Sequence, residues 1–318
     1  MKLSIWIALL AGLTFMTACS PPPPEPLRIV SSPWPGYEPL YLARDLGYLK
    51  DSAVRISELP SANISFEAFK NGSGDVATLT LDEVVILLAE GRKLRLLLVM
   101  DVSNGADAVV ARNDIKSLAG LKGKRLAMEN IPLGVYILNR MLEAAHLKAT
   151  DIDIVPLPED KHEDAYLRGK IDAAITMEPY KSKLVKAGGH VLFDSSQIPN
   201  EIFDLVVVRE EVYQKRRDDL CHLARQWFRT LDYIHANPQE AATRMGKRQG
   251  VDAETFLASM NGMTVPDRKE NRLLLGGSSP ALLAPARRLA EIMRREHMIA
   301  GPVEFAASID PGFAACLQ

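Results

Sequence analysis

Short apolar runs alternate along the chain with longer stretches in which apolar residues recur at helical spacing. This alternation is typical of an α/β domain, where helices connect the strands of a central sheet. The first series predicts strands at Leu27–Ser32, Val54–Leu59, Asp75–Leu79, Leu94–Met100 and Asp107–Ala111. The helices between them are expected at Glu38–Leu46, Ser65–Asn71 and Leu81–Glu90.

A second series begins after a polar stretch at Arg112–Gly123, where the periodicity lapses. Its strands are expected at Arg125–Glu129, Ile152–Leu157, Asp172–Thr176 and His190–Phe193, with helices at Leu133–Leu147, His162–Gly169 and Pro179–Ala187. A last strand is expected at Phe203–Val208. The C-terminal third then predicts helices and no evident strand, at Arg216–Ala236, Pro238–Lys247, Ala253–Met260 and Pro280–His297.

One segment of each series reads alike. Glu67–Thr78 (EAFKNGSGDVAT) and Asp164–Thr176 (DAYLRGKIDAAIT) both pass from an aromatic-bearing helix end through glycine to an aspartate that opens a small-residue strand. Acidic residues then enter the next helix in both copies, as they often do at helix starts. The echo predicts two similar lobes that present strand ends and helix starts to a shared cleft.

The lobes require two crossover segments, which we expect at Val109–Asn113 and Val206–Glu210, where hinges would absorb backbone rotation. Residues 27–110 and 210–318 would form lobe 1, and residues 111–209 lobe 2. The C-terminal helices would pack back onto lobe 1, which makes that lobe discontinuous in sequence.

The stretch Pro33–Asp51 joins the first strand to the first helix. Its turn, Trp34-Pro-Gly-Tyr37, lies at the carboxyl end of a strand, which is where open α/β sheets bind ligands. Proline fixes φ there, and Gly36 permits a backbone that other residues resist. Trp34 and Tyr37 are therefore candidates for ligand contacts, and equally for half-buried packing residues.

The N-terminus has the pattern of an export signal over residues 1–18: Lys2 precedes a short apolar run at Ile5–Phe15. Met16-Thr17-Ala18-Cys19 resembles the lipobox of bacterial lipoproteins, which implies cleavage before Cys19, acylation of its thiol and anchoring to the membrane. The alternative is an ordinary signal peptide with an incidental cysteine. Residues 19–26 are proline-rich and would form an extended tether.

Composition excludes several classes of function. A net charge of −2 over 318 residues and a hydrophobic fraction of 47% describe a globular protein without the basic footprint of a nucleic-acid binder. No nucleotide-binding, catalytic or metal-ligand motif is present, so we expect no cofactor and no metal, and a monomer. Cys221 and Cys316 could form a disulfide; separate buried thiols are the preferred interpretation.

Polar and aromatic residues gather at the ends of the predicted strands. Small hydroxyls and backbone amides at helix starts hold polar ligand atoms, and rings close over apolar parts. Each residue alone is as well explained as a cap or turn residue, and the prediction depends on their joint position. The candidates are Trp34, Tyr37, Ser61, Asn63, Thr78, Thr80, Asp82, Asn104, Asp107, Glu129, Glu178 and Asp204.

These segments resemble a known family. W-x-G-Y-x-P-L-Y-L-A with G-Y-L-K, the F-x-x-G-x-x-D-V-A-T strand, V-S-N-G-A-D-A-V-V and the late run Pro302–Phe313 are similar to periplasmic solute-binding proteins of nitrate, sulfonate and taurine ABC importers, a family that includes the NMT1/THI5-like group. The resemblance covers residues 27–315. It implies a two-lobe, type II periplasmic binding fold, each lobe a mixed sheet flanked by helices, with two hinge crossovers and a ligand that is delivered to a membrane permease.

One departure from the family concerns charge. Binders of nitrate or sulfonate would be expected to offer cations, yet the candidate loops carry Asp82, Glu83, Asp107, Glu129, Glu178 and Asp204 and no Lys or Arg. Because a buried carboxylate without a partner is costly, the ligand should bring positive charge or hydrogen-bond donors. We therefore expect a small nitrogen-containing solute: an amine, a pyrimidine resembling a thiamine precursor, or an amino-sulfonate.

Two other functions are carried as alternatives. A ligand-sensing lipoprotein would use the same cleft without a permease. A pyrimidine synthase of the THI5 type would need a reactive lysine–cofactor site and a cysteine-rich iron motif, which the sparse cysteines of the mature chain do not offer.

Overall fold

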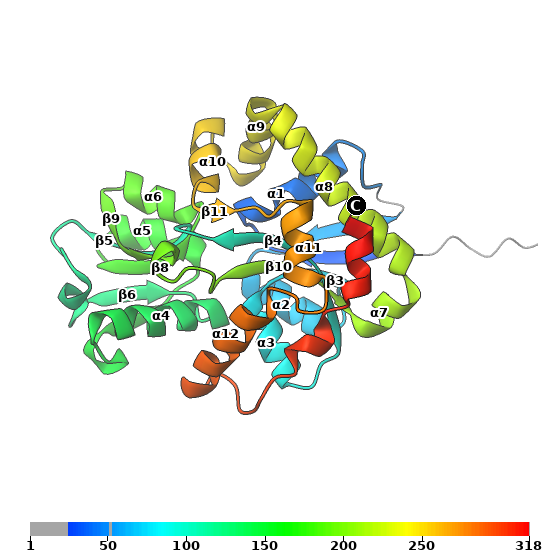
Figure 1. The fold of residues 1–318 in the computed structure, drawn as a ribbon. Helices are drawn as coiled ribbons and strands as arrows, with labels where there is room; N and C mark the ends of the chain where they lie inside the picture. Colours follow the sequence, from blue (N-terminus) through cyan, green and yellow to red (C-terminus); the bar gives the residue numbers. More distant parts are fainter. Residues whose placement is uncertain (1–24, 51–52, 318) are drawn as a thin grey trace, which may run out of the picture.

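The protein folds into two lobes, each with its own sheet (Figure 1). The structure is a computed structural model that describes residues 25–50 and 53–317. The first sheet has the order β11-β4-β10-β3-β1-β2 and the second β7-β6-β8-β5-β9. The predicted fold class, with two mixed sheets flanked by helices, is confirmed. The predicted signal peptide and Cys19 lie outside the described residues.

Strand boundaries fall within a few residues of the predicted ones. The first sheet contains β1 (Leu27–Ser31), β2 (Val54–Glu58), β3 (Val76–Thr80), β4 (Leu94–Ser103), β10 (Phe203–Arg209) and β11 (Met263–Thr264). The second contains β5 (Asp107–Arg112), β6 (Arg125–Met128), β7 (Asp153–Pro156), β8 (Ala173–Met177) and β9 (Gly189–Asp194). In each sheet three parallel strands are followed by antiparallel ones. The two-residue β11, which pairs with β4, was not predicted.

Helices cover both sheets. The first lobe carries α1 (Glu38–Asp45), α2 (Ala62–Lys70) and α3 (Leu81–Ala89), and the second α4 (Pro132–Ala145), α5 (His162–Leu167) and α6 (Tyr180–Lys186). The C-terminal part supplies α7 (Glu210–Lys215), α8 (Arg217–Ala236), α9 (Pro238–Gln249), α10 (Ala253–Met260), α11 (Arg268–Leu275) and α12 (Leu283–Arg295). Short 3-10 turns include η1 (Pro35–Tyr37), η5 (Ser195–Gln197), η6 (Phe305–Ser308) and η7 (Pro311–Leu317).

The C-terminal helices pack on the first lobe, as predicted, with α8 against α1 and β4 and α12 against α3 (Figure 1). Helices α7 and α11 were missed by the sequence analysis. The start of α11 is nevertheless encoded locally: Asp267 caps it and Glu270 bonds back to the backbone N–H of Asp267 at 2.8 Å. This capping box was the available signal.

The crossovers lie earlier in the chain than predicted. β5 pairs with β8 and β9, so it belongs to the second sheet, and β10 pairs with β3 and β4 in the first. The chain therefore changes lobes at residues 104–106 and 195–202, and not at Val109–Asn113 and Val206–Glu210. An apolar pattern predicts that a strand exists but not which strand it pairs with. The sequence therefore could not locate the points at which the chain passes from one lobe to the other.

The echo in the sequence corresponds to a repeated clamp. Asp75 accepts hydrogen bonds from the backbone N–H of Arg28 at 3.0 Å and from its guanidinium at 2.6 and 3.1 Å. In the second lobe Asp172 holds Arg125 in the same way, at 3.0, 3.0 and 2.8 Å. In both lobes the aspartate lies just before the strand and the arginine on the parallel neighbour. Each clamp fixes the register of the two strands that lead to the cleft.

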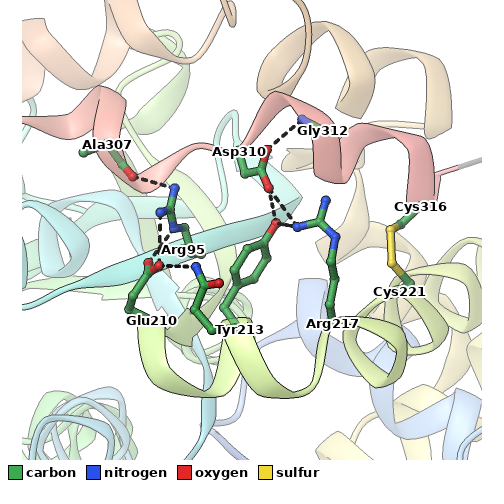
Figure 2. A network of polar contacts seen from close by, with 10 residues as sticks. Arg95, Glu210, Tyr213, Arg217, Cys221, Ala307, Asp310, Gly312 and Cys316 are labelled. Atoms are coloured by element: carbon green, nitrogen blue, oxygen red, sulfur yellow. Dashed lines mark hydrogen bonds and ion pairs between the residues drawn. A yellow bond between two sulfur atoms is a disulfide. The ribbon is translucent and has the colours of Figure 1, made fainter.

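The C-terminal tail is fastened to α7 and α8. A disulfide joins Cys221 on α8 to Cys316 on η7, so the preferred interpretation of separate thiols was wrong. Nearby, Asp310 accepts hydrogen bonds from Tyr213 at 2.5 Å and Arg217 at 2.8 Å, and Arg95 bridges Glu210 and the carbonyl of Ala307 (Figure 2). The tail therefore closes over the end of the first sheet.

Loss of the disulfide is predicted to destabilise the protein. Cys221 and Cys316 are 95 residues apart, and closing a loop of that length raises the free energy of the unfolded chain by about 4.7 kcal/mol. A Cys221→Ala/Cys316→Ala variant should lose roughly 2–5 kcal/mol of unfolding free energy, measured by urea unfolding followed by circular dichroism. Reductant is the matched control, because it should lower the wild-type midpoint and leave the variant unchanged. Equal midpoints for oxidised and reduced wild type would contradict this role.

Candidate ligand-binding site

The loop after β1 is shaped around a carboxyl group from β4. The indole Nε1 of Trp34 donates a hydrogen bond to Asp101 Oδ2 at 3.1 Å, with both side chains buried. A β-carbon on Gly36 would lie 1.9 Å from that same oxygen, so any other residue would displace the carboxyl group. Glycine is needed here for this close approach and not for an unusual backbone, because Gly36 is absent from the glycines with positive φ. The Trp-Pro-Gly-Tyr turn thus packs against the carboxyl group of Asp101 and holds it in place.

A second carboxyl group lies beside the first. Asp204 on β10 is in register with Asp101 on β4, and it accepts a hydrogen bond from the hydroxyl of Tyr37. Both aspartates are buried, at 0% and 3% exposure. Burial raises the pKa of Asp101 to about 7, and burial followed by the Asp101 charge raises the pKa of Asp204 well above its usual value.

Helix α3 begins at the same edge of the first sheet. Thr80 caps it, and the carboxylate of Glu83 accepts a hydrogen bond from the backbone N–H of Thr80 at 3.0 Å. Asp82 and Glu83 occupy the first turn, where helix N–H groups favour negative charge, and both are buried. Burial raises the pKa of Asp82 to about 6, and burial together with Asp82 raises that of Glu83 well above the usual range.

The second lobe contributes acids and an apolar wall. Asp107 opens β5, is 3% exposed, and its Oδ2 has no hydrogen-bond partner among the described residues. Glu129 directly follows β6, and Glu159 begins a short 3-10 turn after β7. Burial raises the pKa of both carboxyl groups. Ile131 and Leu133, at the start of α4, supply the apolar part.

Three small cavities adjoin one another between the lobes. The first, about 20 Å³, is lined by Trp34, Tyr37, Glu83, Asp107, Asp204 and Leu133 among others. The second, about 30 Å³, shares Ala62 and Met177 with it, and the third, about 10 Å³, shares Asp107 with the first and Glu129 with the second. Each has room for about one or two water molecules. The lobes are therefore closed onto a narrow, continuous cleft.

The cleft is acidic. All ionisable side chains that line the three cavities are Asp, Glu or Tyr, and none is Lys, Arg or His. A cation does lie near one edge: Lys181 donates to the carbonyl of Gly105 at 2.8 Å and is 3.6 Å from Glu178. Its charge acts on Asp107 but it does not line the cavities.

The structure brings most of the predicted site residues together. Trp34, Tyr37, Thr80, Asp107 and Asp204 line the first cavity, and Ser61 and Glu129 line the second. The remaining predicted residues have other surroundings. Asn63 and Asn104 are exposed, and the hydroxyl of Thr78 donates to Ser31 within the sheet at 2.9 Å. Asp82 is buried in the first turn of α3 and is not among the residues that line the cavities. Glu178 accepts hydrogen bonds from Ser182 at the start of α6.

Two acidic residues of the cleft were missed. Asp101 directly follows the apolar run Leu94–Met100, so it had the same signal, an acid at a strand end, that identified Asp107 and Asp204. Glu159 follows Leu157-Pro158 and is buried between the lobes. Within residues 25–50 and 53–317, no group of three or more His, Cys, Asp or Glu side chains is placed to hold a metal ion. No helix of that same part is long and apolar enough to cross a membrane.

Comparison with known proteins gives related binding proteins and one enzyme. The taurine-binding periplasmic protein of Escherichia coli (strain K12) is 23% identical over 267 residues, which cover 80% of this chain and 83% of that protein. The periplasmic aliphatic sulphonate binding protein SsuA from Escherichia coli has a TM-score of 0.74 at 19% identity, covering 92% of this chain and 99% of that one. The desulfurization enzyme DSZB has a TM-score of 0.67 at 16% identity, over 92% and 98% of the two chains.

The fold is thus shared by binding proteins and an enzyme, and it does not by itself decide between them. The family follows from the sequence match: residues 34–241 fit the model described as NMT1/THI5 like. That range begins at Trp34 and includes both lobes. The chain therefore belongs to the NMT1/THI5-like family.

Proposed function

We propose that this protein is the solute-binding component of an ABC importer, and that it captures a small organic solute carrying a positively charged nitrogen. The family and the relatives, which are periplasmic taurine- and sulfonate-binding proteins, support the solute-binding role. The observation that carries the ligand class is the lining of the cleft, in which carboxyl groups have no basic partner.

Charge argues against a simple sulfonate or nitrate. An anion between the lobes would lie beside Glu83, Asp107 and Asp204, all of them buried. An ammonium or amidinium group in the same place would neutralise these carboxyl groups and donate hydrogen bonds to them, and such bonds contribute about 1.5–3 kcal/mol each. An amino-sulfonate is compatible with the site because it carries the required ammonium.

The aromatic and apolar walls favour an organic cation over a bare ion. Trp34, Ile131 and Leu133 all line the first cavity. A cation beside an indole gains further attraction from the ring's electrons. The proposed ligand thus combines a charged nitrogen with a small flat or apolar part, as an alkylamine or an aminopyrimidine does.

Release to a membrane permease completes the proposed role. The crossovers at 104–106 and 195–202 are the segments about which the lobes would open. We further propose that the protein acts as a monomer held at the membrane through a lipid on Cys19, as the lipobox-like sequence indicates. A sensing role would use the same cleft and would differ in having no permease partner.

A matched set of probes tests the ligand class. Ethylamine, taurine and ethanesulfonate share a two-carbon unit. Ethylamine carries an ammonium group, ethanesulfonate carries a sulfonate group, and taurine carries both. We expect ethylamine and taurine to raise the melting temperature saturably, and ethanesulfonate to have no effect beyond that of sodium chloride. Small ligands gain at most about 1.5 kcal/mol per non-hydrogen atom, so millimolar concentrations are needed. A 4-aminopyrimidine extends the series. Stabilisation by ethanesulfonate alone would overturn the proposal.

Neutralising a carboxyl group in the cleft should weaken binding of the cationic probes. We expect Asp107→Asn to raise the dissociation constant for ethylamine or taurine at least about tenfold, because a charge-assisted hydrogen bond is lost. Asp164→Asn is the control: this side chain on α5 is 62% exposed, pairs with Arg168, and should bind like wild type. Isothermal titration calorimetry measures both. Equal constants for wild type and Asp107→Asn would place the cation elsewhere.

A further inference from the structure

Asp204, which lines the first cavity, and Asp101, its neighbour on β4, form a buried pair of carboxyl groups with too few donors. Asp101 and Asp204 are cross-strand partners on β4 and β10, and residues directly opposite each other on antiparallel strands have β-carbons about 4.5–5.5 Å apart. Trp34 supplies one N–H to Asp101 and Tyr37 one O–H to Asp204. Oδ1 of Asp101 is buried and has no donor among the described residues. Both donors are neutral, so they satisfy two oxygens without compensating either charge.

The surroundings of the pair add only further acids. Helix α3 presents Asp82 and Glu83, and β5 presents Asp107, while β3 places the neutral Thr80 opposite Asp204. The other neighbour of β4, the short strand β11, consists of Met263 and Thr264 and carries no charge. Lys181 acts on Asp107 and is engaged by Glu178 and the carbonyl of Gly105. No basic side chain of the described chain contacts the pair.

We propose that Asp101 and Asp204 share one proton in the ligand-free protein, and that the ligand's cationic nitrogen takes the place of this proton. The first half stands on the geometry alone, and the second rests on the proposed function. On binding, the shared proton leaves for bulk water, Asp204, which lines the first cavity, accepts an N–H hydrogen bond from the ligand, and the charge of Asp101 beside it adds to the attraction. One positive charge replaces another, so the buried site keeps its net charge.

Physical chemistry supports a shared proton. Two carboxyl groups in contact cannot both ionise at ordinary pH, because the second charge would form beside the first in a buried site. The pKa of Asp101 is raised to about 7, mainly by burial, and that of Asp204 is raised well above its usual value by burial and by the Asp101 charge, which agrees with a pair that keeps one proton. Gly36 maintains this arrangement, since a side chain there would displace the Asp101 carboxyl group from Trp34.

The exchange of a proton for the ligand's cation determines whether ligand affinity rises or falls with pH. A cation that displaces a proton binds more tightly as pH rises, up to tenfold per pH unit below the pKa of the pair, and its affinity levels off above it. An anion placed beside the pair would show the opposite trend, because it would need the proton retained or a second one added. Asp101 is thus a specificity-determining residue that the strand-end candidates did not include.

The shared proton is tested without any ligand through the indole N–H of Trp34. In the ¹⁵N-labelled full-length protein, this resonance, assigned with Trp34→Phe, should shift as the pair loses its proton between about pH 5 and about pH 9. Trp227 is the internal control, because its indole lies within the first lobe and has no carboxyl partner. In Asp101→Asn, whose amide supplies a permanent donor, the shift should vanish; Asp204→Asn is the second such variant. A Trp34 resonance that does not titrate in wild type, or titrates equally in Asp101→Asn, would overturn the shared proton.

Proton release is tested separately by calorimetry with ethylamine and taurine. Titrations below the midpoint of the indole shift, in two buffers of different ionisation enthalpy, should give about one proton released per probe bound. Probes that bind without releasing a proton would refute the exchange and leave the shared proton in place. If the indole titrates and neither probe binds, the proposed ligand class fails while the carboxyl pair is retained.

Discussion

Burial of carboxyl groups that no basic side chain neutralises is the constraint on which the cleft depends. Asp101 is fully buried, and its carboxyl group determines the shape of the loop that faces it: the indole of Trp34 donates to it, and only glycine fits at position 36. Tyr37 is oriented in turn by Asp204. A buried, unpaired charge is costly, so such a cluster persists only where protons or a bound cation compensate it. The loop thus both supports the Asp101 carboxyl group and supplies an aromatic side chain to the lining of the first cavity.

The two lobes bring this cluster together because each contains the same aspartate–arginine clamp between two parallel strands. An aspartate before the third parallel strand clamps an arginine on the first, in both sheets, so the strand ends reach the cleft at the same height. Behind the cleft, Glu201 in the second crossover accepts hydrogen bonds from Tyr136 at 2.7 Å and Arg140 at 2.8 Å on α4, and lies 3.2 Å from Arg288 on α12. These contacts join the second crossover to α4 of the second lobe and to α12, which packs on the first lobe.

Much of this fold was predictable from sequence because apolar strand runs and capped helices are local signals. Strand pairing could not be predicted. The sequence pattern located β5 and β10, but it placed the crossovers between the lobes inside these strands and not before them. The reason is that tertiary packing, and not the local sequence, decides which strand pairs with which. The same limit applies to Cys221 and Cys316, whose contact depends on the path of the tail. Strand-end acids such as Asp107 and Asp204 were found by position, whereas Asn63 and Asn104 share that position and are exposed. Position identifies the edge of the sheet, and only the structure shows which side chains face inward.

The proposed ligand class is supported by the magnitudes of the competing interactions. At an effective dielectric constant near 20, a charge 4 Å from one carboxylate gains or loses about 4 kcal/mol, so exchanging a sulfonate for an ammonium changes the binding free energy by about 8 kcal/mol. Full burial of an apolar side chain contributes only about 1.5–3 kcal/mol. Contacts with Trp34, Ile131 and Leu133 therefore cannot reverse a preference set by Glu83, Asp107 and Asp204 once these groups ionise. In the proposed function, charge selects between cations and anions, and the apolar walls select among cations. A relative with the same fold that binds sulfonates must accordingly differ in the charged groups of its cleft, whatever the similarity of its strands and helices.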